Sequence, residues 1–290
     1  MWEIALCDKI GEKLTHSGMN FQICFREQND KYWNLEKSLK SVKIIVIYEE
    51  QMEVEMLLKN EVKAIGFDVG HTLIKYNNPL NWQGLYRSGL EHAAAVANVI
   101  LSEDMILAAT DILLKYNTRV NYREWETTSD CIFNEILKRW GLQTDLYTIK
   151  FGFYSFFKAD AEPYPETIDT MKRLKQYGIK IGILTDVAYG MDNEFSLEDI
   201  SVLSDFIDAA VTSVDIGYRK PNSAGYLKLL ESLKVSPNEM IFIGDEEKDI
   251  IGARKLGIVS ALINRGKEIK DFGQDYTLES LSDIFSVLHF

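Results

Sequence analysis

The most informative segment of the sequence is Ala64-Ile65-Gly66-Phe67-Asp68-Val69-Gly70-His71-Thr72-Leu73, an apolar run that ends at a carboxylate followed by a glycine-containing turn. A continuous apolar run is typical of a buried parallel strand, and ligand sites in open α/β sheets lie just beyond the carboxyl ends of such strands. Asp68 would stand at that end, with Gly70 allowing a tight turn and Thr72 supplying a hydroxyl. A plain turn after a strand has the same appearance, so this stretch alone leaves both interpretations open.

The composition is that of an ordinary globular protein with an acidic balance. The 290 residues are 46% hydrophobic and 26% charged, and the formal net charge is -12. A sequence-independent nucleic-acid binder needs a basic footprint, so we expect no nucleic-acid partner. An anionic substrate is still compatible with this charge, because a bound cation and a few basic groups decide the potential inside one cleft.

Cysteine usage and the first residues indicate a cytoplasmic protein. Cys7, Cys24 and Cys131 are odd in number and scattered, which fits free thiols in a reducing compartment. Glu3 and Asp8 stand too early for the apolar segment of a signal peptide. No apolar stretch approaches the ~20 residues that span a bilayer, so we expect no membrane partner.

Residues 1–60 look like a small, separate α+β extension. Their patterns predict a helix at 4–14 and strands at 21–25 and 42–48. We find no catalytic chemistry in this segment. It is either a packing extension or a module that docks a protein partner.

Residues 79–159 carry four helical patterns. Ser102 is expected to begin one of them, and Ser129 to cap another that Gly141 ends. Short helices joined by short loops suggest a compact bundle. Because strand–helix alternation resumes only after this segment, we interpret the bundle as a helical cap inserted into a core made of residues 61–78 and 160–290.

The rest of the chain alternates regularly between strands and helices. Strands are expected at 180–184, 209–211, 240–243 and 258–262, and helices at 166–177, 199–206, 223–233, 249–256 and 278–288. Such alternation predicts the α/β class, with a doubly wound parallel sheet and right-handed crossovers.

Chemically active side chains follow several of these strands. Asp68, Thr185 and Asp245 come at strand ends, and Lys220 and Asp249 lie in the segments just beyond. Parallel strands bring such ends to one edge of the sheet. Carboxylates that gather there need a cation, and oxygen ligands without His or Cys select Mg²⁺ or a similar hard ion. With Lys220 and Thr185 present, the edge has room for a phosphoryl group.

At this point the chain resembles the haloacid dehalogenase-like (HAD) superfamily of hydrolases, in the branch whose helical cap follows the first strand. Four motifs match in order and spacing over residues 61–290. They are Asp68-Val69-Gly70-His71-Thr72-Leu73, Ile183-Leu184-Thr185-Asp186, Gly217-Tyr218-Arg219-Lys220-Pro221 and Ile243-Gly244-Asp245-Glu246-Glu247-Lys248-Asp249.

The resemblance implies a role for each matching residue. Asp68 would be the nucleophile that forms an aspartyl-phosphate, while Thr185 and Lys220 would hold the phosphoryl oxygens. Thr72 would support the turn beside the nucleophile. The implied Mg²⁺ ligands are Asp68, the carbonyl of Gly70, Asp245 and Asp249, the last either as a ligand or as support. Asp186 stands where the family commonly has Asn.

Gly70 departs from the family pattern. Phosphatases of this superfamily usually carry a second Asp there, which protonates the leaving group and later activates water. General acid–base help of this kind is typically worth ~10²–10⁴ in rate, and glycine has no side chain to supply it.

Three explanations remain open. The first is a phosphatase with little need of proton help, or with an acid from elsewhere, such as His71, Tyr86, Arg87 or Glu91. The second is a phosphonatase-like P–C hydrolase, which needs a cap lysine for a Schiff base; Lys115, Lys138 and Lys150 are available. The third is a fold kept for binding, with residues 1–60 recruiting a partner. A halide-removing enzyme fits worst, because those enzymes lack the metal.

We therefore predict a Mg²⁺-dependent hydrolase of small phosphorylated metabolites, slow on unactivated alkyl phosphates. Its predicted substrate-binding residues are Thr72, Thr185, Lys220, His71 and Arg87. Trp82, Tyr86, Arg87 and Trp125 are candidates for the lining of the cap pocket.

Overall fold

The computed structural model describes residues 23–26, 32–35, 62–77, 81–158, 161–266 and 268–288. The chain divides into two compact units, Met1–Leu58 and Lys59–Phe290. In the first unit, β1 (Ile23–Arg26) pairs antiparallel with β2 (Tyr32–Leu35), so β1 overlaps the strand predicted at 21–25. The helix predicted at 4–14 and the strand predicted at 42–48 lie outside the described residues.

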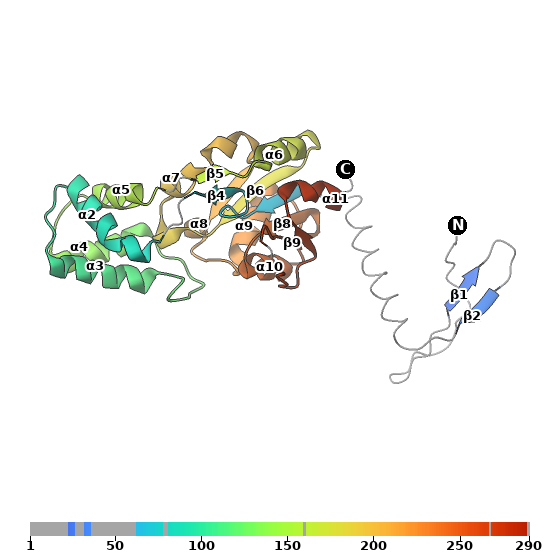
Figure 1. Ribbon diagram of the computed structural model, residues 1–290, viewed down its shortest axis with the longest axis horizontal. Coiled ribbons are helices and arrows are strands. Elements are labelled where there is room, and N and C mark those ends of the chain that lie inside the picture. Colours follow the sequence, from blue (N-terminus) through green and yellow to red (C-terminus); the bar gives the residue numbers. More distant parts are fainter. Residues whose placement is uncertain are drawn as a thin grey trace. The chain divides into compact units, whose positions relative to one another are not determined.

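A six-stranded parallel sheet forms the centre of the second unit (Figure 1). Its strands are β3 (Ala64–Phe67), β6 (Lys180–Thr185), β7 (Ala209–Thr212), β8 (Met240–Gly244), β9 (Val259–Ile263) and β10 (Tyr276–Leu278). They run in the order β10-β9-β8-β3-β6-β7, with every pairing parallel. The predicted α/β fold with a doubly wound parallel sheet is confirmed.

Helices pack against both faces of this sheet. Figure 1 shows α6 (Thr167–Gln176) above the sheet and α10 (Glu247–Arg254) below it, on the side of α9 (Ser223–Leu233). Glycines let α9 approach closely: a Cβ on Gly182 would lie 2.7 Å from a methyl carbon of Leu229. The remaining short helices are η2 (Ala188–Gly190), α7 (Asn193–Ser196), η3 (Glu198–Phe206), α8 (Ser213–Ile216), η4 (Pro237–Glu239), η5 (Leu281–Asp283) and α11 (Ile284–Val287).

The helix predicted at 278–288 is wrong in its first part. Tyr276–Leu278 is the strand β10, paired with β9, and helical structure begins only at η5. Ser280 and Asp283 form a capping box there, which places the helix start two residues beyond the strand.

Four longer helices and one short one make a separate cluster, hereafter the helical cluster. They are η1 (Gln83–Leu85), α2 (Tyr86–Val96), α3 (Glu103–Tyr116), α4 (Ser129–Trp140) and α5 (Leu146–Phe156). Ser102 caps α3 as predicted, because its hydroxyl accepts the N–H of Met105. Thr128, and not Ser129, caps α4, and Gly141 ends that helix in the left-handed conformation (φ 68°).

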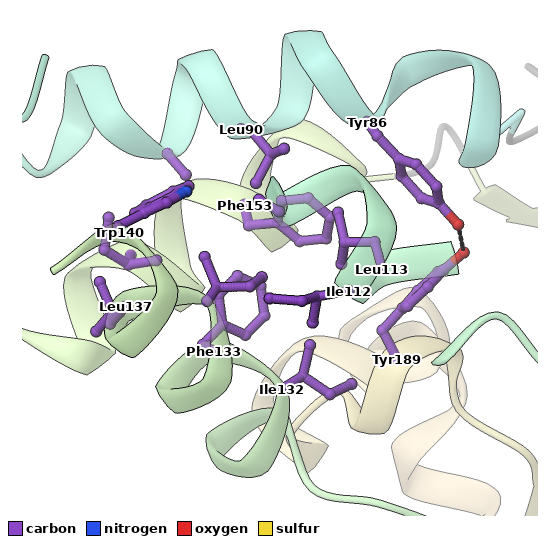
Figure 2. Packing of buried hydrophobic residues seen from close by; sticks show 14 of the residues in the cluster. Tyr86, Leu90, Ile112, Leu113, Ile132, Phe133, Leu137, Trp140, Phe153 and Tyr189 are labelled. Carbon is purple, nitrogen blue, oxygen red and sulfur yellow. Dashed lines mark hydrogen bonds between the residues drawn. The ribbon is translucent and has the colours of Figure 1, made fainter. Parts of the chain in front are cut away.

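The helical cluster has its own hydrophobic core (Figure 2). Phe133, Phe153 and Leu113 are fully buried at its centre, and the Trp140 indole N–H donates to the carbonyl of Met105 at 2.7 Å. Tyr189 reaches into this core from η2, after β6, and its hydroxyl hydrogen-bonds that of Tyr86. The cluster is therefore tied to the segment that follows a core strand.

The chain enters and leaves the helical cluster through one short ribbon. β4 (Ile74–Tyr76) pairs antiparallel with β5 (Ala161–Pro163), with Tyr76 opposite Ala161. A second connection joins the loop before α4 to the loop after α8, where the Glu126 N–H donates to the carbonyl of Gly217 at 2.8 Å. The domain boundaries at 78 and 159 stay a prediction. Of the helices in the described part of the chain, none is long and apolar enough to cross a membrane.

Candidate active site

Asp68 and Lys220 form the centre of the site. Asp68 follows β3 directly, and its backbone N–H donates to Ile243 of the neighbouring β8 at 2.9 Å. The Nζ atom of Lys220 lies 2.5 Å from Asp68 Oδ1 and 2.6 Å from Asp249 Oδ1. The Lys220 side chain is only 2% exposed. Burial lowers its pKa, but the carboxylates of Asp249 and Asp68 outweigh that effect and raise it, so the ammonium is charged at neutral pH.

The start of α10 fixes Asp249. Glu246 is the N-cap residue, and its backbone N–H donates to Asp249 Oδ2 at 3.0 Å. Gly244 makes room for this arrangement, because a Cβ there would lie 2.4 Å from the Asp249 carboxylate. Oδ2 of Asp249 therefore accepts a hydrogen bond from the helix terminus, while the buried Oδ1 makes an ion pair with Lys220 and has no hydrogen-bond partner among the described residues. This geometry suits a residue that holds the ammonium beside Asp68.

Three carboxylates converge at this edge of the sheet. Oxygens of Asp68, Asp245 and Asp249 all lie within 4.8 Å of one another, and the Thr72 hydroxyl donates to Asp245 Oδ1 at 3.4 Å. Burial raises the pKa of Asp245 to about 6, and the charges of Asp249 and Glu246 add to that rise. Burial also raises the pKa of Asp249 to about 6 and that of Asp68 above its usual range. A divalent cation would relieve this crowding, and an oxygen-only donor set fits a hard ion.

Asp186 and Lys248 form a second charged pair beside the first. Asp186 Oδ1 accepts the backbone N–H of Lys220 at 3.0 Å, and its Oδ2 lies 3.1 Å from Lys248 Nζ. Burial would raise the pKa of Asp186, but the positive charges of Lys220, Lys248 and Arg219 outweigh it and hold that pKa below the usual range. The negative charge of Asp186, at the position where the family commonly has Asn, is thus balanced by neighbouring positive charges. Its carboxylate also positions the backbone of Lys220.

A tight turn carries the chain from Asp68 to β4. His71 sits in the left-handed conformation (φ 57°), and its N–H donates to the carbonyl of Ile74 at 2.8 Å. The turn brings the Tyr76 ring next to Gly70. A Cβ added to Gly70 would lie 3.3 Å from the Tyr76 hydroxyl oxygen. Burial raises the pKa of Tyr76 far above its usual value, so its hydroxyl keeps its proton.

A cavity of about 920 Å³ opens between the end of the sheet and the helical cluster. The predicted site residues that line it are Asp68, Gly70, His71, Thr185, Lys220 and Asp245. Thr72 and Asp249 are fully buried and are not among its lining residues. Trp82 lines the cavity too, stacked on Phe157 with ring centroids 4.0 Å apart.

Other predicted residues lie elsewhere. Arg87 is on the surface of α2, where its Nη1 donates to Glu103 at 3.0 Å, so the structure does not place it for substrate binding. Glu91 pairs with Arg87, and Trp125 is 53% exposed outside the cavity lining. None of the proposed Schiff-base lysines lines the cavity: Lys115 pairs with Glu135, Lys150 is held by Asp130 and Asp192, and Lys138 is absent from the lining.

Tyr76, Arg219 and Lys248 also line the cavity, although the sequence patterns assign them no role. Tyr76 comes from a three-residue strand, and Arg219 is held by Glu126, a buried acid from the helical cluster's loop. Lys248 had one available signal, since it is the only base in the acidic run from Asp245 to Asp249. The other contacts join segments far apart in the chain.

The fold and the site together define a class of hydrolases, and comparison with known proteins identifies it. Residues 62–257 match the family described as haloacid dehalogenase-like hydrolase. The chain therefore belongs to the haloacid dehalogenase-like hydrolases.

Curated relatives cover part of the chain. The pyrophosphatase PpaX of Bacillus cereus (strain G9842) is 31% identical over 131 residues, which is 44% of this chain and 60% of that protein. The protein of the same name from Bacillus mycoides (strain KBAB4) is 32% identical over 131 residues, which is again 44% of this chain and 60% of that protein. The match thus spans about three-fifths of these relatives.

Solved structures share the fold at low identity. The HAD phosphatase from Thermococcus onnurineus has a TM-score of 0.53 and 23% identity, covering 78% of this chain and 98% of that one. The 2-haloacid dehalogenase from Pseudomonas syringae pv. tomato DC3000 has a TM-score of 0.55 and 19% identity. The match covers 79% of this chain and 98% of that one. Because phosphatases and dehalogenases both appear, these likenesses establish the fold and leave the reaction open.

Proposed function

We propose that this protein is a Mg²⁺-dependent hydrolase of small phosphorylated metabolites that works through an aspartyl-phosphate on Asp68. The observation that carries the proposal is the convergence of Asp68 and Asp245 with Lys220 in the lining of one cavity. A nucleophilic carboxylate, further anionic oxygens and a buried cation are the groups that phosphoryl transfer requires.

The chain's own residues have distinct roles in this reaction. Asp68 attacks phosphorus through the oxygen that Lys220 does not hold. Lys220 and Thr185 bind the phosphoryl oxygens, and the ammonium offsets negative charge as it develops in the transition state. Asp249 and Asp186 keep the Lys220 side chain and backbone in place.

The metal-binding residues are Asp68, Asp245 and the carbonyl of Gly70, with Asp249 in support. Bound Mg²⁺ would supply positive charge to the phosphoryl group and to the attacking carboxylate. The structure of YfnB from Bacillus subtilis, which shares the fold (TM-score 0.50, 20% identity), is described as bound to magnesium, and this supports the choice of ion.

The leaving group sets a preference among phosphorylated compounds. Gly70 offers no side chain to protonate a poor leaving group, so substrates whose leaving group is stable as an anion should react fastest. A phosphoanhydride is such a substrate, and the two relatives named pyrophosphatase support including pyrophosphate in any screen.

The test is a screen of phosphorylated metabolites and pyrophosphate with Mg²⁺, comparing wild type with Asp68→Asn. We expect phosphate release by the wild type that Asp68→Asn and EDTA abolish. Asp111→Asn, an exposed change on α3, is the matched control and should keep full activity. Release that survives Asp68→Asn would contradict the proposed nucleophile.

Lack of Asp68-dependent release from every compound would favour the binding-protein alternative. In that case residues 1–60, whose docking of a protein partner stays a prediction, become the segment to delete in a pull-down. The cytoplasmic location also stays a prediction. The P–C hydrolase alternative has no support from Lys115, Lys138 or Lys150, because none of them lines the cavity.

A further inference from the structure

The space beside Gly70 is filled by Tyr76. A Cβ added to Gly70 would lie 3.3 Å from the Tyr76 hydroxyl oxygen and 3.3 Å from its Cε2 atom. These distances are shorter than ordinary packing contacts, so a Cβ at position 70 would require the Tyr76 ring to move by a few tenths of an ångström, and a longer side chain would require more. The absence of a side chain at Gly70 therefore allows the Tyr76 ring to approach this closely.

Two contacts hold the phenol in this position. The backbone of Tyr76 belongs to β4, where it pairs with Ala161 of β5. Its ring meets the His71 ring edge-on, with centroids 5.6 Å apart and an interplanar angle of 80°. The ring is thus fixed from the ribbon on one side and from the turn after Asp68 on the other.

The hydroxyl itself is available. It lines the same cavity as Asp68 and Asp245, and within the described parts of the chain it donates to no acceptor. A half-buried hydroxyl usually finds a partner, so a free one at the edge of a substrate cavity is ready to donate to a bound molecule.

We propose that the Tyr76 hydroxyl replaces the absent acid by donating a hydrogen bond to the leaving-group oxygen, which makes Tyr76 a further catalytic residue. This inference rests on the proposed function. As Asp68 forms its bond to phosphorus, the bond from phosphorus to the leaving oxygen breaks and its electron pair stays on that oxygen. The phenol keeps its proton and stabilises this charge, and the departing anion takes a proton from solvent.

The experiment measures kcat/KM for aryl phosphates with leaving groups of increasing pKa, in wild type and Tyr76→Phe. Phenylalanine keeps the ring and removes only the donor. We expect the loss to grow with leaving-group pKa, from little for the best leaving group to ~10-fold or more for the poorest. Tyr147→Phe, an exposed change outside the cavity lining, is the control and should follow the wild-type line.

A parallel line for Tyr76→Phe, whether unchanged or lowered equally for every leaving group, would overturn this inference while wild-type turnover keeps the proposed function standing. Absence of Asp68-dependent turnover in the wild type would overturn both.

A second measurement tests the shared space without relying on turnover. We expect Gly70→Asp to lower the melting temperature in the wild type and to have a smaller effect in a Tyr76→Ala background, where the ring is gone. Equal effects in the two backgrounds would show that Tyr76 does not occupy the place of a side chain at position 70, and would overturn the inference.

Discussion

Replacing Lys220 by methionine should strongly destabilise the metal-free protein. The change removes a buried ammonium 2.5 Å from Asp68 and 2.6 Å from Asp249, and it leaves two carboxylates facing each other. Removing one partner of a buried ion pair typically costs ~3–5 kcal/mol. For a unit of this size, each kcal/mol lowers the melting temperature by about 2–4 °C, so a fall of about 6–20 °C is expected.

The loss should depend on pH. The pKa of Asp249 is already raised to about 6, and loss of the ammonium raises it further. A carboxyl group whose pKa is higher in the folded state than in the unfolded state destabilises the fold once it ionises, and stability returns as the pH falls through that pKa. The gap between variant and wild type should therefore narrow between pH 8 and pH 5.5.

Thermal unfolding followed by circular dichroism in EDTA at the two pH values checks this. The control is Lys228→Met, which removes a 51% exposed lysine from its pair with Glu231 on α9. A surface pair of this kind is worth at most ~1 kcal/mol. Equal losses in the two variants, or a Lys220→Met loss that is the same at both pH values, would show that Lys220 does not compensate the buried charges of Asp68 and Asp249.

Three other changes have defined outcomes. Added Mg²⁺ should raise the wild-type melting temperature more at pH 8 than at pH 5.5, because Asp245 and Asp249, with pKa values of about 6, must lose protons to hold it. Gly244→Ala should cost ~1–3 kcal/mol in urea unfolding, because its Cβ would collide with the Asp249 carboxylate at 2.4 Å. Glu126→Gln should cost on the order of 1–3 kcal/mol in the same assay, because it removes the charge that holds Arg219. An unchanged unfolding midpoint in either variant would contradict the corresponding contact.

The sheet was predictable because its central strands are apolar throughout. Ile65 and Phe67 of β3, and Ile241 and Ile243 of β8, are all fully buried, so both segments are continuous apolar runs that end at a carboxylate. The positions of Asp68 and Asp245 at one edge follow from parallel pairing alone.

Shorter elements were not predictable by the same means. β4, β5 and β10 have three residues each, too few to show a period of two, and their pairing partners decide their conformation. The position of Tyr76 could not be predicted for this reason, because its place beside Gly70 depends on the β4–β5 ribbon.

Arg87 shows a different limit. A helical pattern predicts which residues share a face, but the direction of that face depends on the neighbours. In the structure α2 turns Arg87 outward to Glu103 of α3, away from the cavity. Helix orientation relative to the rest of the fold is a tertiary property, and no local pattern encodes it.

The strand order has a consequence for biosynthesis. Ala64 of β3 pairs with Lys180 of β6 and with Met240 of β8, so the central strand is made first and its two neighbours much later. A growing chain must complete the whole helical cluster before either partner strand exists, and such distant pairings slow folding. During that interval the unpaired backbone groups at the edges of β3 and its apolar side chains are exposed to other chains. Most of the helical cluster's core comes from its own helices, so these helices can pack while the ribosome is still producing the strands that flank β3, and Tyr189 joins the core after β6 has been made.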